Sequence, residues 1–358
     1  MLRVLHVIWS LAGGGAERVV LALARGAPAD IRCTVQPIAP GGALEGDFAD
    51  AGIFVLPAVR SGARMTGAAV ARLAAVARRH DVVHTHLWAG DTWGRLAGFL
   101  AGRPVISTEH NTRPDAGWRG RISAAMSPFS HQIVCVSDAA AESARRAGVR
   151  AARLTVIPNG VDLAHHVPTS LPEGVPPRLL FCGRLVEQKG ADVLLDAVER
   201  LDDIPDLEVR LLGEGHQRLA LAEHPVVREG RAELIGWRPD LRPHLSWCSV
   251  VVMPSRWEGF GLFALEALAS GRPVVASGVD ALPEIVGNAG WMVPPGDPPA
   301  LAGMLRTVLG DPQEVAARAA RAPGRARRFT VDAMVSAYAD IWRRLPAGRR
   351  GIYNGGRV

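Results

Sequence analysis

The sequence predicts an α/β protein made of two doubly wound halves, each built around a parallel sheet. Short apolar runs alternate with Ala/Leu/Arg-rich segments of helical periodicity, as in successive βαβ units. The alternation stops at a proline-rich segment near the middle of the chain and then starts again. The length of 358 residues suits two domains, each with its own hydrophobic core.

In the first half, strands are expected at 3–9, 33–37, 81–86, 104–108, 132–137 and 154–158, and helices at 16–25 and 68–79. The segment 163–177 contains four prolines without periodicity and is interpreted as a linker. In the second half, strands are expected at 178–182, 208–212, 250–253 and 273–276, and helices at 191–201, 262–269 and 298–309. A last helix at 331–345 follows an Arg-rich connection and is expected to pack back on the first half. The predicted domains are 1–165, 166–330 and the C-terminal piece 331–358.

The composition narrows the functional class. Hydrophobic residues make up 48% of the chain and charged residues 21%, as in globular proteins. We found no apolar run of about 18 residues and no leader pattern, so a cytoplasmic protein is expected. The four scattered cysteines are expected to be free thiols, which suits a reducing compartment. The net charge of +6 is dispersed without a basic and aromatic run, so no nucleic-acid partner is expected.

The loop after the first strand carries three consecutive glycines, Gly13, Gly14 and Gly15, directly before a helix. Such glycines expose backbone N–H groups beside a helix N-terminus, which suits a phosphate. A dinucleotide fingerprint would need another glycine where Arg18 stands, so a Rossmann dehydrogenase is disfavoured. The alternative is a plain tight turn in which Glu17 favours the helix dipole.

The loop after the strand at 178–182 carries Arg184 and Lys189. Lys189 is the only lysine among the 41 lysine and arginine residues of the chain. A guanidinium fork and a compact ammonium can converge on one diphosphate, and arginine does not replace lysine as a point charge. We therefore interpret Lys189 as a phosphate ligand, with a solvated surface charge as the alternative.

The segment PSRWEGFGLFALEALASGRP at 254–273 places Glu258 and Glu266 eight positions apart in a stretch that is otherwise built to be buried. A buried carboxylate needs strong partners, so each is either a structural liability or a ligand-binding group. The backbone N–H groups of 261–263 open a helix and would point at a phosphate. The two carboxylates could then bind hydroxyl pairs on either side of it, unless arginines and helix amides satisfy both.

Three histidines follow or end strands of the first half. His84 and His86 share one face at the end of the strand at 81–86, and His110 follows the strand at 104–108. A zinc site at His84 and His86 would need further ligands, for which the sequence gives no pattern. No metal is therefore expected, and histidines of the core or of a cleft wall are the preferred interpretation.

Together these segments resemble the retaining glycosyltransferases of family 4. The resemblance covers nearly the whole chain and rests on five motifs: EGFGLFALE, which is an E-x7-E pattern, GRLVEQKG, VIPNGVD at 156–162, VCVSDAAAES at 134–143, and the N-terminal GGAE. It implies a GT-B fold, in which two Rossmann-like domains face a central cleft and the last helix crosses back to the N-terminal domain.

The resemblance also implies roles around a nucleotide-sugar donor, which is a co-substrate, so no cofactor is expected. The implied ligands are Gly14, Gly15, Arg184, Lys189, Gly261, Leu262 and Phe263 for the diphosphate, Glu266 for the ribose, Glu258, Phe260 and Gly261 for the sugar, and Gly213, Trp237 and Arg238 for the base. His110 and Glu258 would lie at the reacting centre. The implied reaction is metal-independent transfer with retention, in which a phosphate oxygen takes the acceptor proton.

The sequence leaves the substrates open. A UDP-sugar is preferred over GDP-mannose on family frequency alone, and the acceptor is a small molecule, a glycan or a lipid-linked molecule. Two loops of the first half are basic. They either contact the inner face of an anionic membrane or are simply solvated, and the two alternatives are weighted equally. The residues concerned are Arg60, Arg64, Arg113, Trp118, Arg119 and Arg121. The competing functions are a nucleotide-sugar 2-epimerase of the same fold and a non-catalytic nucleotide-sugar-binding protein.

Overall fold

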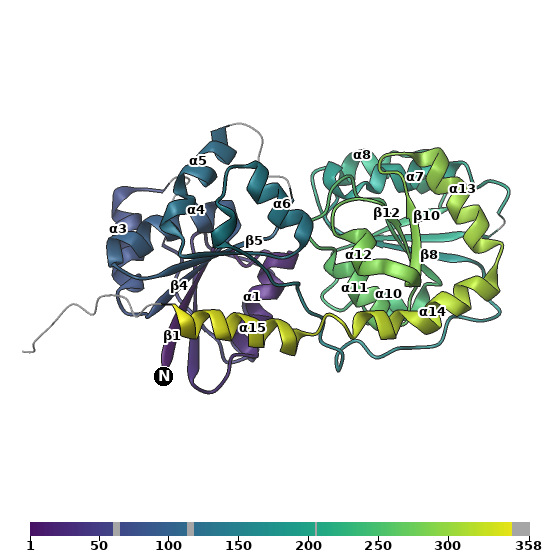
Figure 1. Ribbon diagram of the computed structural model, residues 1–358. Helices are drawn as coiled ribbons and strands as arrows, with labels where there is room; N and C mark the ends of the chain where they lie inside the picture. Colours follow the sequence, from purple (N-terminus) through teal and green to yellow (C-terminus); the bar gives the residue numbers. More distant parts are fainter. Residues whose placement is uncertain (60–64, 113–117, 205, 346–358) are drawn as a thin grey trace, which may run out of the picture. The chain divides into compact units, whose positions relative to one another are not determined.

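The computed structural model describes residues 1–59, 65–112, 118–204 and 206–345 (Figure 1). The chain divides into two compact units. Unit 1 comprises Met1–Pro158 and Val331–Val358, and unit 2 comprises Asn159–Thr330.

Unit 1 contains a seven-stranded sheet with the strand order β3-β2-β1-β4-β5-β6-β7, in which all pairs are parallel. Its strands are β1 (Leu2–Ile8), β2 (Ile31–Pro37), β3 (Phe54–Val55), β4 (Val82–His86), β5 (Val105–Glu109), β6 (Gln132–Cys135) and β7 (Leu154–Val156). Its helices are α1 (Gly15–Arg25), α2 (Glu45–Asp50), α3 (Gly67–Ala77), α4 (Leu87–Ala101), α5 (Trp118–Met126), α6 (Asp138–Arg146) and α15 (Val331–Arg344).

Unit 2 contains a six-stranded parallel sheet with the order β10-β9-β8-β11-β12-β13. Its strands are β8 (Arg178–Cys182), β9 (Glu208–Leu212), β10 (Ala232–Gly236), β11 (Val250–Met253), β12 (Val274–Ser277) and β13 (Gly290–Val293). Its helices are the short 3-10 helix η3 (Glu187–Lys189), α7 (Ala191–Glu199), α8 (Arg218–Ala222), α9 (Pro225–Arg228), α10 (Arg242–Trp247), α11 (Leu262–Ala269), α12 (Leu282–Val286), α13 (Pro298–Leu309) and α14 (Pro312–Ala326).

The prediction of two doubly wound parallel sheets is confirmed. Strands of both sheets are buried along their length because helices cover both faces, and this is why they read as continuous apolar runs in the sequence. In each sheet the strand order reverses next to the first strand, between β1 and β4 in unit 1 and between β8 and β11 in unit 2. The loops at the carboxyl ends of these strand pairs are where such sheets bind ligands.

Several helices lie outside the predicted ranges, and α4 and α14 have a clear physical reason for having been missed. Helix α4 carries Gly90, Gly94 and Gly98 at a spacing of four, and a Cβ on any of them would lie within 2.8 Å of β1, β4 or β5. These glycines let α4 lie directly on the sheet, but they remove the apolar pattern of a helix. The Arg-rich segment before residue 331 was expected to be a connection. It instead forms α14, capped by Asp311, whose side chain accepts a hydrogen bond from the Glu314 N–H.

The proline-rich segment 163–177 lies within unit 2, which begins at Asn159, and is not a free linker. It is held by Arg272, a fully buried arginine. The Arg272 guanidinium donates to the carbonyl oxygens of Thr169 and Ser170, both at 2.7 Å, and to Thr169 Oγ1 at 2.6 Å. An arginine that satisfies several backbone carbonyls at once fixes a segment that has no helix or strand of its own.

Helix α15 packs on unit 1, beside α1 (Figure 1). Its buried side chains include Tyr338 and Trp342, and the Tyr338 hydroxyl lies 3.1 Å from Thr108 Oγ1 on β5. Arg343 forms a bidentate ion pair with Asp30 at 2.7 and 3.0 Å. The expected return of the last helix to the first half is confirmed.

Two further expectations can be compared with the described residues. All four cysteines are unpaired, and Cys33, Cys135 and Cys248 are buried. Among the described helices, none combines the length and the apolar character that a membrane crossing requires.

We predict that Gly190→Ala destabilises unit 2 more than Gly296→Ala. Both glycines have left-handed backbones, with φ of 68° and 66°. A Cβ at Gly190 would lie 2.1 Å from the Pro254 carbonyl oxygen, whereas Gly296 has no atom within 4 Å of the added Cβ. The left-handed backbone costs about 1–2 kcal/mol in both variants, and the clash adds about 1–3 kcal/mol at Gly190. Urea unfolding measures both free energies; equal losses would contradict the close approach.

Candidate functional site

Two loops of unit 2 meet at the carboxyl ends of β8 and β11. Gln188 connects them, because its Nε2 donates to the Trp257 carbonyl at 3.2 Å and its own carbonyl accepts from the Arg256 N–H at 2.8 Å. The Arg256 guanidinium forms a bidentate pair with Asp192 at 2.6 and 2.9 Å. These hydrogen bonds fix the positions of the two loops relative to each other.

Lys189 and Glu258 form an ion pair across these loops. The side chains are 18% and 9% exposed, so the pair is largely removed from water. Ser255 Oγ donates to the same carboxylate oxygen of Glu258 at 3.4 Å, and the Glu258 N–H donates to Asp280 at 2.8 Å. The single lysine of the chain therefore provides the counter-charge for its buried Glu258.

Helix α11 begins directly after this pair. Gly261 caps it with φ of 96° and ψ of 50°, a left-handed conformation that favours glycine. Phe260 and Phe263 are buried, whereas Glu266 is half-buried one turn inside the helix. Helix amides at 261–263 thus lie next in sequence to Glu258, as the motif predicts.

Arg184 is exposed, and its guanidinium donates to Gln188 Oε1 at 2.9 Å. Arg184 is thus linked to Gln188, the same residue that connects the two loops. Gly213 follows β9 with φ of 131°, and a Cβ there would lie 1.9 Å from the Gly183 carbonyl oxygen, so the loops after β8 and β9 are in close contact. Trp237 and Arg238 follow β10 and are exposed. All these residues lie at the same edge of the sheet.

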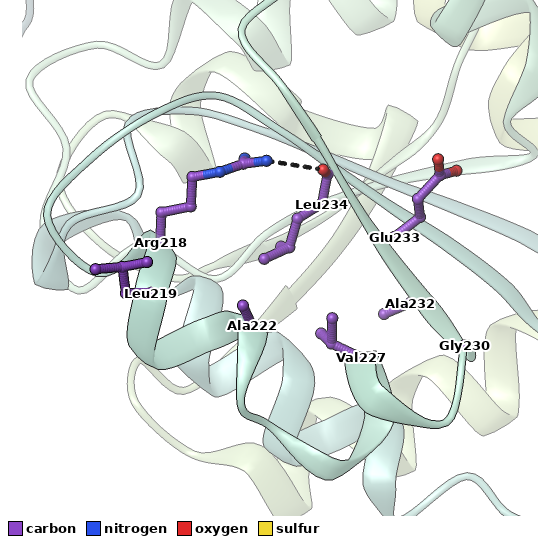
Figure 2. Close-up of a pocket in the computed structure, with 8 residues that line it drawn as sticks. All are labelled: Arg218, Leu219, Ala222, Val227, Gly230, Ala232, Glu233 and Leu234. Carbon is purple, nitrogen blue, oxygen red and sulfur yellow. Dashed lines mark hydrogen bonds between the residues drawn. The ribbon is translucent and has the colours of Figure 1, made fainter.

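A hollow of about 500 Å³ lies elsewhere on unit 2 (Figure 2). It is formed by α8, α9 and the edge strand β10, and the Arg218 guanidinium crosses it to the Leu234 carbonyl oxygen at 3.3 Å. None of the site residues expected from the sequence lines it. Because it lacks the residues at the strand ends, we do not treat it as the functional site.

In unit 1, the residues singled out from the sequence follow β1, β4 and β5. Gly14 caps α1 and Gly15 is its first residue, and a Cβ on Gly14 would lie 2.7 Å from a Glu17 carboxylate oxygen. His110 follows β5 and is half-buried. Its Nε2 lies 3.1 Å from His86 Nδ1.

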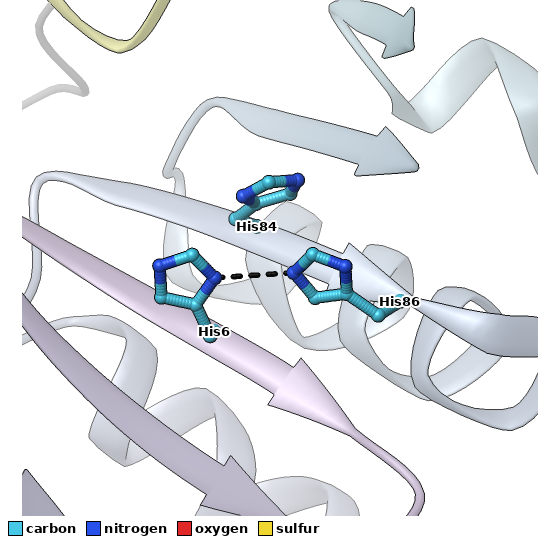
Figure 3. A group of neighbouring side chains, drawn as sticks. All are labelled: His6, His84 and His86. Carbon is cyan, nitrogen blue, oxygen red and sulfur yellow. Dashed lines mark hydrogen bonds between the residues drawn. The ribbon is translucent and has the colours of Figure 1, made fainter. Parts of the chain in front are cut away.

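The cluster around His86 contains a histidine that sequence reasoning missed. His6 pairs in register with His84 across β1 and β4, and His6 Nδ1 lies 3.1 Å from His86 Nε2 (Figure 3). One ring nitrogen from each of His6, His84 and His86 lies within 4.8 Å of the others. The expectation that His84 and His86 have no further ligand candidate is therefore wrong, because His6 lies beside them. The signal was the strand periodicity of VLHVI, which puts His6 of β1 on the same face of the sheet as His84 of β4.

Burial keeps these imidazoles neutral. It lowers the pKa of His6 to about 3 and the pKa of His110 to about 4, and it lowers the pKa of His84 and of His86 well below the usual range. Each ring then carries one N–H and one lone pair, so it can donate one hydrogen bond and accept one.

A buried charge network lies below the loop after β5. Arg95, which is 1% exposed, lies 3.4 Å from a Glu109 oxygen and 3.8 Å from an Asp91 oxygen, and its Nε donates to Ser107 Oγ at 2.9 Å. Burial raises the pKa of Asp91. This network connects α4 to the residue before His110, and nothing in the local sequence pattern distinguished it from an ordinary exposed i,i+4 pair.

We predict that Lys189→Met destabilises unit 2 by about 3 kcal/mol, because it leaves the Glu258 carboxylate buried without a counter-charge. Adding Glu258→Gln in the same chain should recover most of the loss. Arg306→Met breaks an exposed pair with Asp203, whose side chains are 46% and 51% exposed, and should cost about 0.2–1 kcal/mol. Urea unfolding of the wild type, Lys189→Met, Glu258→Gln and the double variant closes this cycle; additive effects of the two single changes would show that the pair is not coupled.

Comparison with known proteins identifies the family. Residues 13–165 match the profile described as Glycosyltransferase Family 4, and residues 176–311 match the profile described as Glycosyl transferases group 1. A D-inositol 3-phosphate glycosyltransferase of Xylanimonas cellulosilytica is 34% identical over 320 residues, which cover 75% of this chain and 74% of that protein. A glycogen synthase of Mycobacterium tuberculosis is 32% identical over 300 residues, which cover 76% and 70%.

Solved structures agree with this family. The crystal structure of Anabaena HepE with UDP and glucose has a TM-score of 0.86 and 25% identity, and covers 96% of this chain and 100% of HepE. The lipopolysaccharide outer core galactosyltransferase WaaB, at 17% identity and a TM-score of 0.71, covers 96% of this chain and 100% of WaaB, and shares the fold. The chain therefore belongs to glycosyltransferase family 4, has the GT-B fold and is a glycosyltransferase.

Proposed function

We propose that this enzyme transfers a sugar from a nucleotide diphosphate sugar, preferably a UDP-sugar, to an acceptor hydroxyl, with retention of the anomeric configuration and without a metal ion. The observation that carries the proposal is the pair of Lys189 and Glu258 next to the start of α11. An ammonium group and a helix N-terminus can bind a phosphate, and a neighbouring carboxylate can accept hydrogen bonds from hydroxyl groups.

For the donor we assign the diphosphate to Lys189, Arg184 and the amides of 261–263. The Lys189 ammonium is 18% exposed and has three N–H donors, so it can keep its bond to Glu258 and still donate to a phosphate oxygen. Helix α11 directs its first N–H groups and the positive end of its dipole to the same ligand. In unit 1 we assign Gly14 and Gly15 to the phosphates as well.

The remaining donor groups follow from the same assignment. Glu266 lies one turn inside α11, where its carboxylate would accept from the ribose hydroxyls. Glu258 would accept from hydroxyls of the transferred sugar, together with the backbone at Phe260 and Gly261, and His110 would contact the same sugar. Gly213, Trp237 and Arg238 are assigned to the base by backbone and stacking contacts.

The chemistry required of the protein is stabilisation of the leaving group. The bond between the anomeric carbon and the diphosphate oxygen breaks, the diphosphate takes the electron pair, and the acceptor oxygen bonds to the same face of the sugar. A phosphate oxygen takes the acceptor proton. Two cations and the helix dipole offset the charge that develops on the diphosphate, which is the part a metal would otherwise play.

Two crystal structures of one related protein support the donor preference. HepE, at 25% identity, has been crystallised with UDP-glucose and with UDP and glucose.

The alternatives, a nucleotide-sugar 2-epimerase and a non-catalytic binding protein, are distinguished by assay. Incubation of the chain with a panel of UDP- and GDP-sugars should give slow release of free nucleotide; epimerised donor alone, or binding without any release, would contradict the proposed transfer.

The acceptor stays a choice among a small molecule, a glycan and a lipid-linked molecule. The two relatives carry names that point to different products, an inositol phosphate glycoside and glycogen, so their acceptors do not transfer to this chain. Of the basic loop residues, Arg60, Arg64 and Arg113 and the side chains of Trp118 and Arg119 lie outside the described part of the chain. Arg121 is exposed. We propose a cytoplasmic enzyme, for which contact with an anionic membrane is testable by vesicle sedimentation.

We predict that Lys189→Arg and Glu266→Ala each weaken UDP binding by about 1.5–3 kcal/mol, the range of hydrogen bonds to charged groups. Lys189→Arg keeps the charge next to Glu258 but replaces the point charge by a planar fork. Glu233→Ala, an exposed glutamate in the hollow of Figure 2, is the matched control and should bind normally. Calorimetric titration with UDP measures the affinities; wild-type affinity in Lys189→Arg would rule out the diphosphate assignment.

We predict that turnover of the donor needs no divalent cation. Donor hydrolysis should be unchanged after dialysis against EDTA and should not increase when magnesium or manganese is restored. A rate abolished by EDTA and recovered with manganese would show that Lys189, Arg184 and the helix amides are insufficient to neutralise the leaving diphosphate.

A further inference from the structure

Three imidazoles of unit 1 form a continuous hydrogen-bonded chain. His6 Nδ1 lies 3.1 Å from His86 Nε2 (Figure 3), and His86 Nδ1 lies 3.1 Å from His110 Nε2. His6 and His86 have no exposed surface, whereas His110 is half-buried. Since its Nε2 is bonded to His86, Nδ1 is the ring nitrogen of His110 that remains for a ligand.

The chain permits only two arrangements of its protons. A neutral imidazole has one donor and one acceptor nitrogen, so the tautomer of one ring sets that of the next. In the first arrangement, protons lie on the Nε2 atoms of His110, His86 and His6, and His110 Nδ1 is a lone pair. In the second, they lie on the three Nδ1 atoms, and His110 Nδ1 carries an N–H.

The surroundings of His6 favour the second arrangement. His6 Nε2 is buried and has no hydrogen-bond partner among the described residues. The Trp342 ring lies edge-on to His6, with centroids 5.6 Å apart, and its buried indole N–H also lacks an acceptor there. The first arrangement would leave two neighbouring N–H donors without acceptors, whereas the second leaves a lone pair beside one N–H. Unpaired buried N–H groups are costly, so the second arrangement is the more stable.

We propose that His86 and His6 are positioning residues that hold neutral His110 with its proton on Nδ1, so that His110 presents a hydrogen-bond donor, and not a proton acceptor, to an oxygen of the sugar. The inference rests on the proposed function for the identity of that oxygen. It agrees with a reaction in which the acceptor proton goes to a phosphate oxygen, because a histidine fixed in this form cannot take it.

The same cluster offers a different occupant, a divalent metal ion on His6, His84 and His86, whose nitrogens lie within 4.8 Å of one another. A metal ion needs a free lone pair on each ligand nitrogen. Both ring nitrogens of His86 are already used, one as donor and one as acceptor, in its hydrogen bonds to His6 and His110. Metal binding and the hydrogen-bonded chain therefore exclude each other. One equivalent of zinc in the purified protein, lost in His6→Leu, would overturn the proposal.

The direct test is the tautomer of His110. Long-range ¹H–¹⁵N spectra of protein labelled at histidine separate protonated from unprotonated ring nitrogens, and loss of one signal set in His110→Asn assigns it. The proposal expects a protonated Nδ1 and an unprotonated Nε2 in His110, and the same pattern in His86. A protonated Nε2 in His110 would overturn it. This readout is independent of turnover.

The functional test compares variants of His86. His86→Leu removes the donor to His110 and should lower kcat for donor hydrolysis about 10²-fold with little change in KM, the scale of one lost oriented contact. His86→Asn places an amide N–H near the position of Nδ1 and should recover most of kcat and the Nδ1–H signal. His84→Leu is the matched control, because His84 is equally buried on the same strand but bonds to Thr108 Oγ1, not to His110.

These variants distinguish a failure of the positioning role from a failure of the proposed function. Equal losses of kcat in His84→Leu and His86→Leu, or no recovery in His86→Asn, would overturn the positioning role. If the wild type turned over no nucleotide sugar, the proposed function would fail, and the His110 spectrum alone would then support or overturn the tautomer.

Discussion

The loops after β8 and β11 in unit 2 meet at one ion pair, between Lys189 and Glu258. The Glu258 side chain is only 9% exposed, so its carboxylate needs a counter-charge beside it. Lys189 reaches this carboxylate because the loops after the paired strands β8 and β11 lie together. Two features maintain that approach: Gly190, where a side chain would collide with the Pro254 carbonyl, and Gln188, which is bonded to both loops. The single lysine of this arginine-rich chain is thus the counter-charge of Glu258.

Unit 1 places its costly polar groups at the corresponding position of its sheet. The histidine chain and the Arg95 network both lie at the carboxyl ends of β4 and β5, next to the point where the strand order reverses. Buried imidazoles and an arginine without solvent are destabilising unless their partners are complete. Buried ionisable groups thus lie at the carboxyl ends of strands in both units, where parallel α/β sheets bind ligands.

The sequence predicted what depends on local pattern and missed what depends on contacts between distant segments. Apolar alternation located ten strands, and the glycine, lysine and glutamate motifs located the loops that lie at the strand ends. Helix α4 was missed because its glycines serve contact with the sheet, and the segment 163–177 was misread because its partner, Arg272, lies a hundred residues away. His6 could have been found, since its strand pairs with that of His84. Asp280 has a left-handed backbone, and its side chain accepts a hydrogen bond from the Glu258 N–H. Nothing in the sequence indicated this contact.

We assign the donor site of this glycosyltransferase to the Lys189–Glu258 pair and the start of α11. A crystal structure of the chain soaked with UDP-glucose tests this assignment. We expect the diphosphate within hydrogen-bond distance of Lys189 Nζ and of the amides at 261–263, with Glu266 on the ribose. A nucleotide bound elsewhere, for example in the hollow beside Arg218, with the Lys189–Glu258 pair free of ligand, would contradict it.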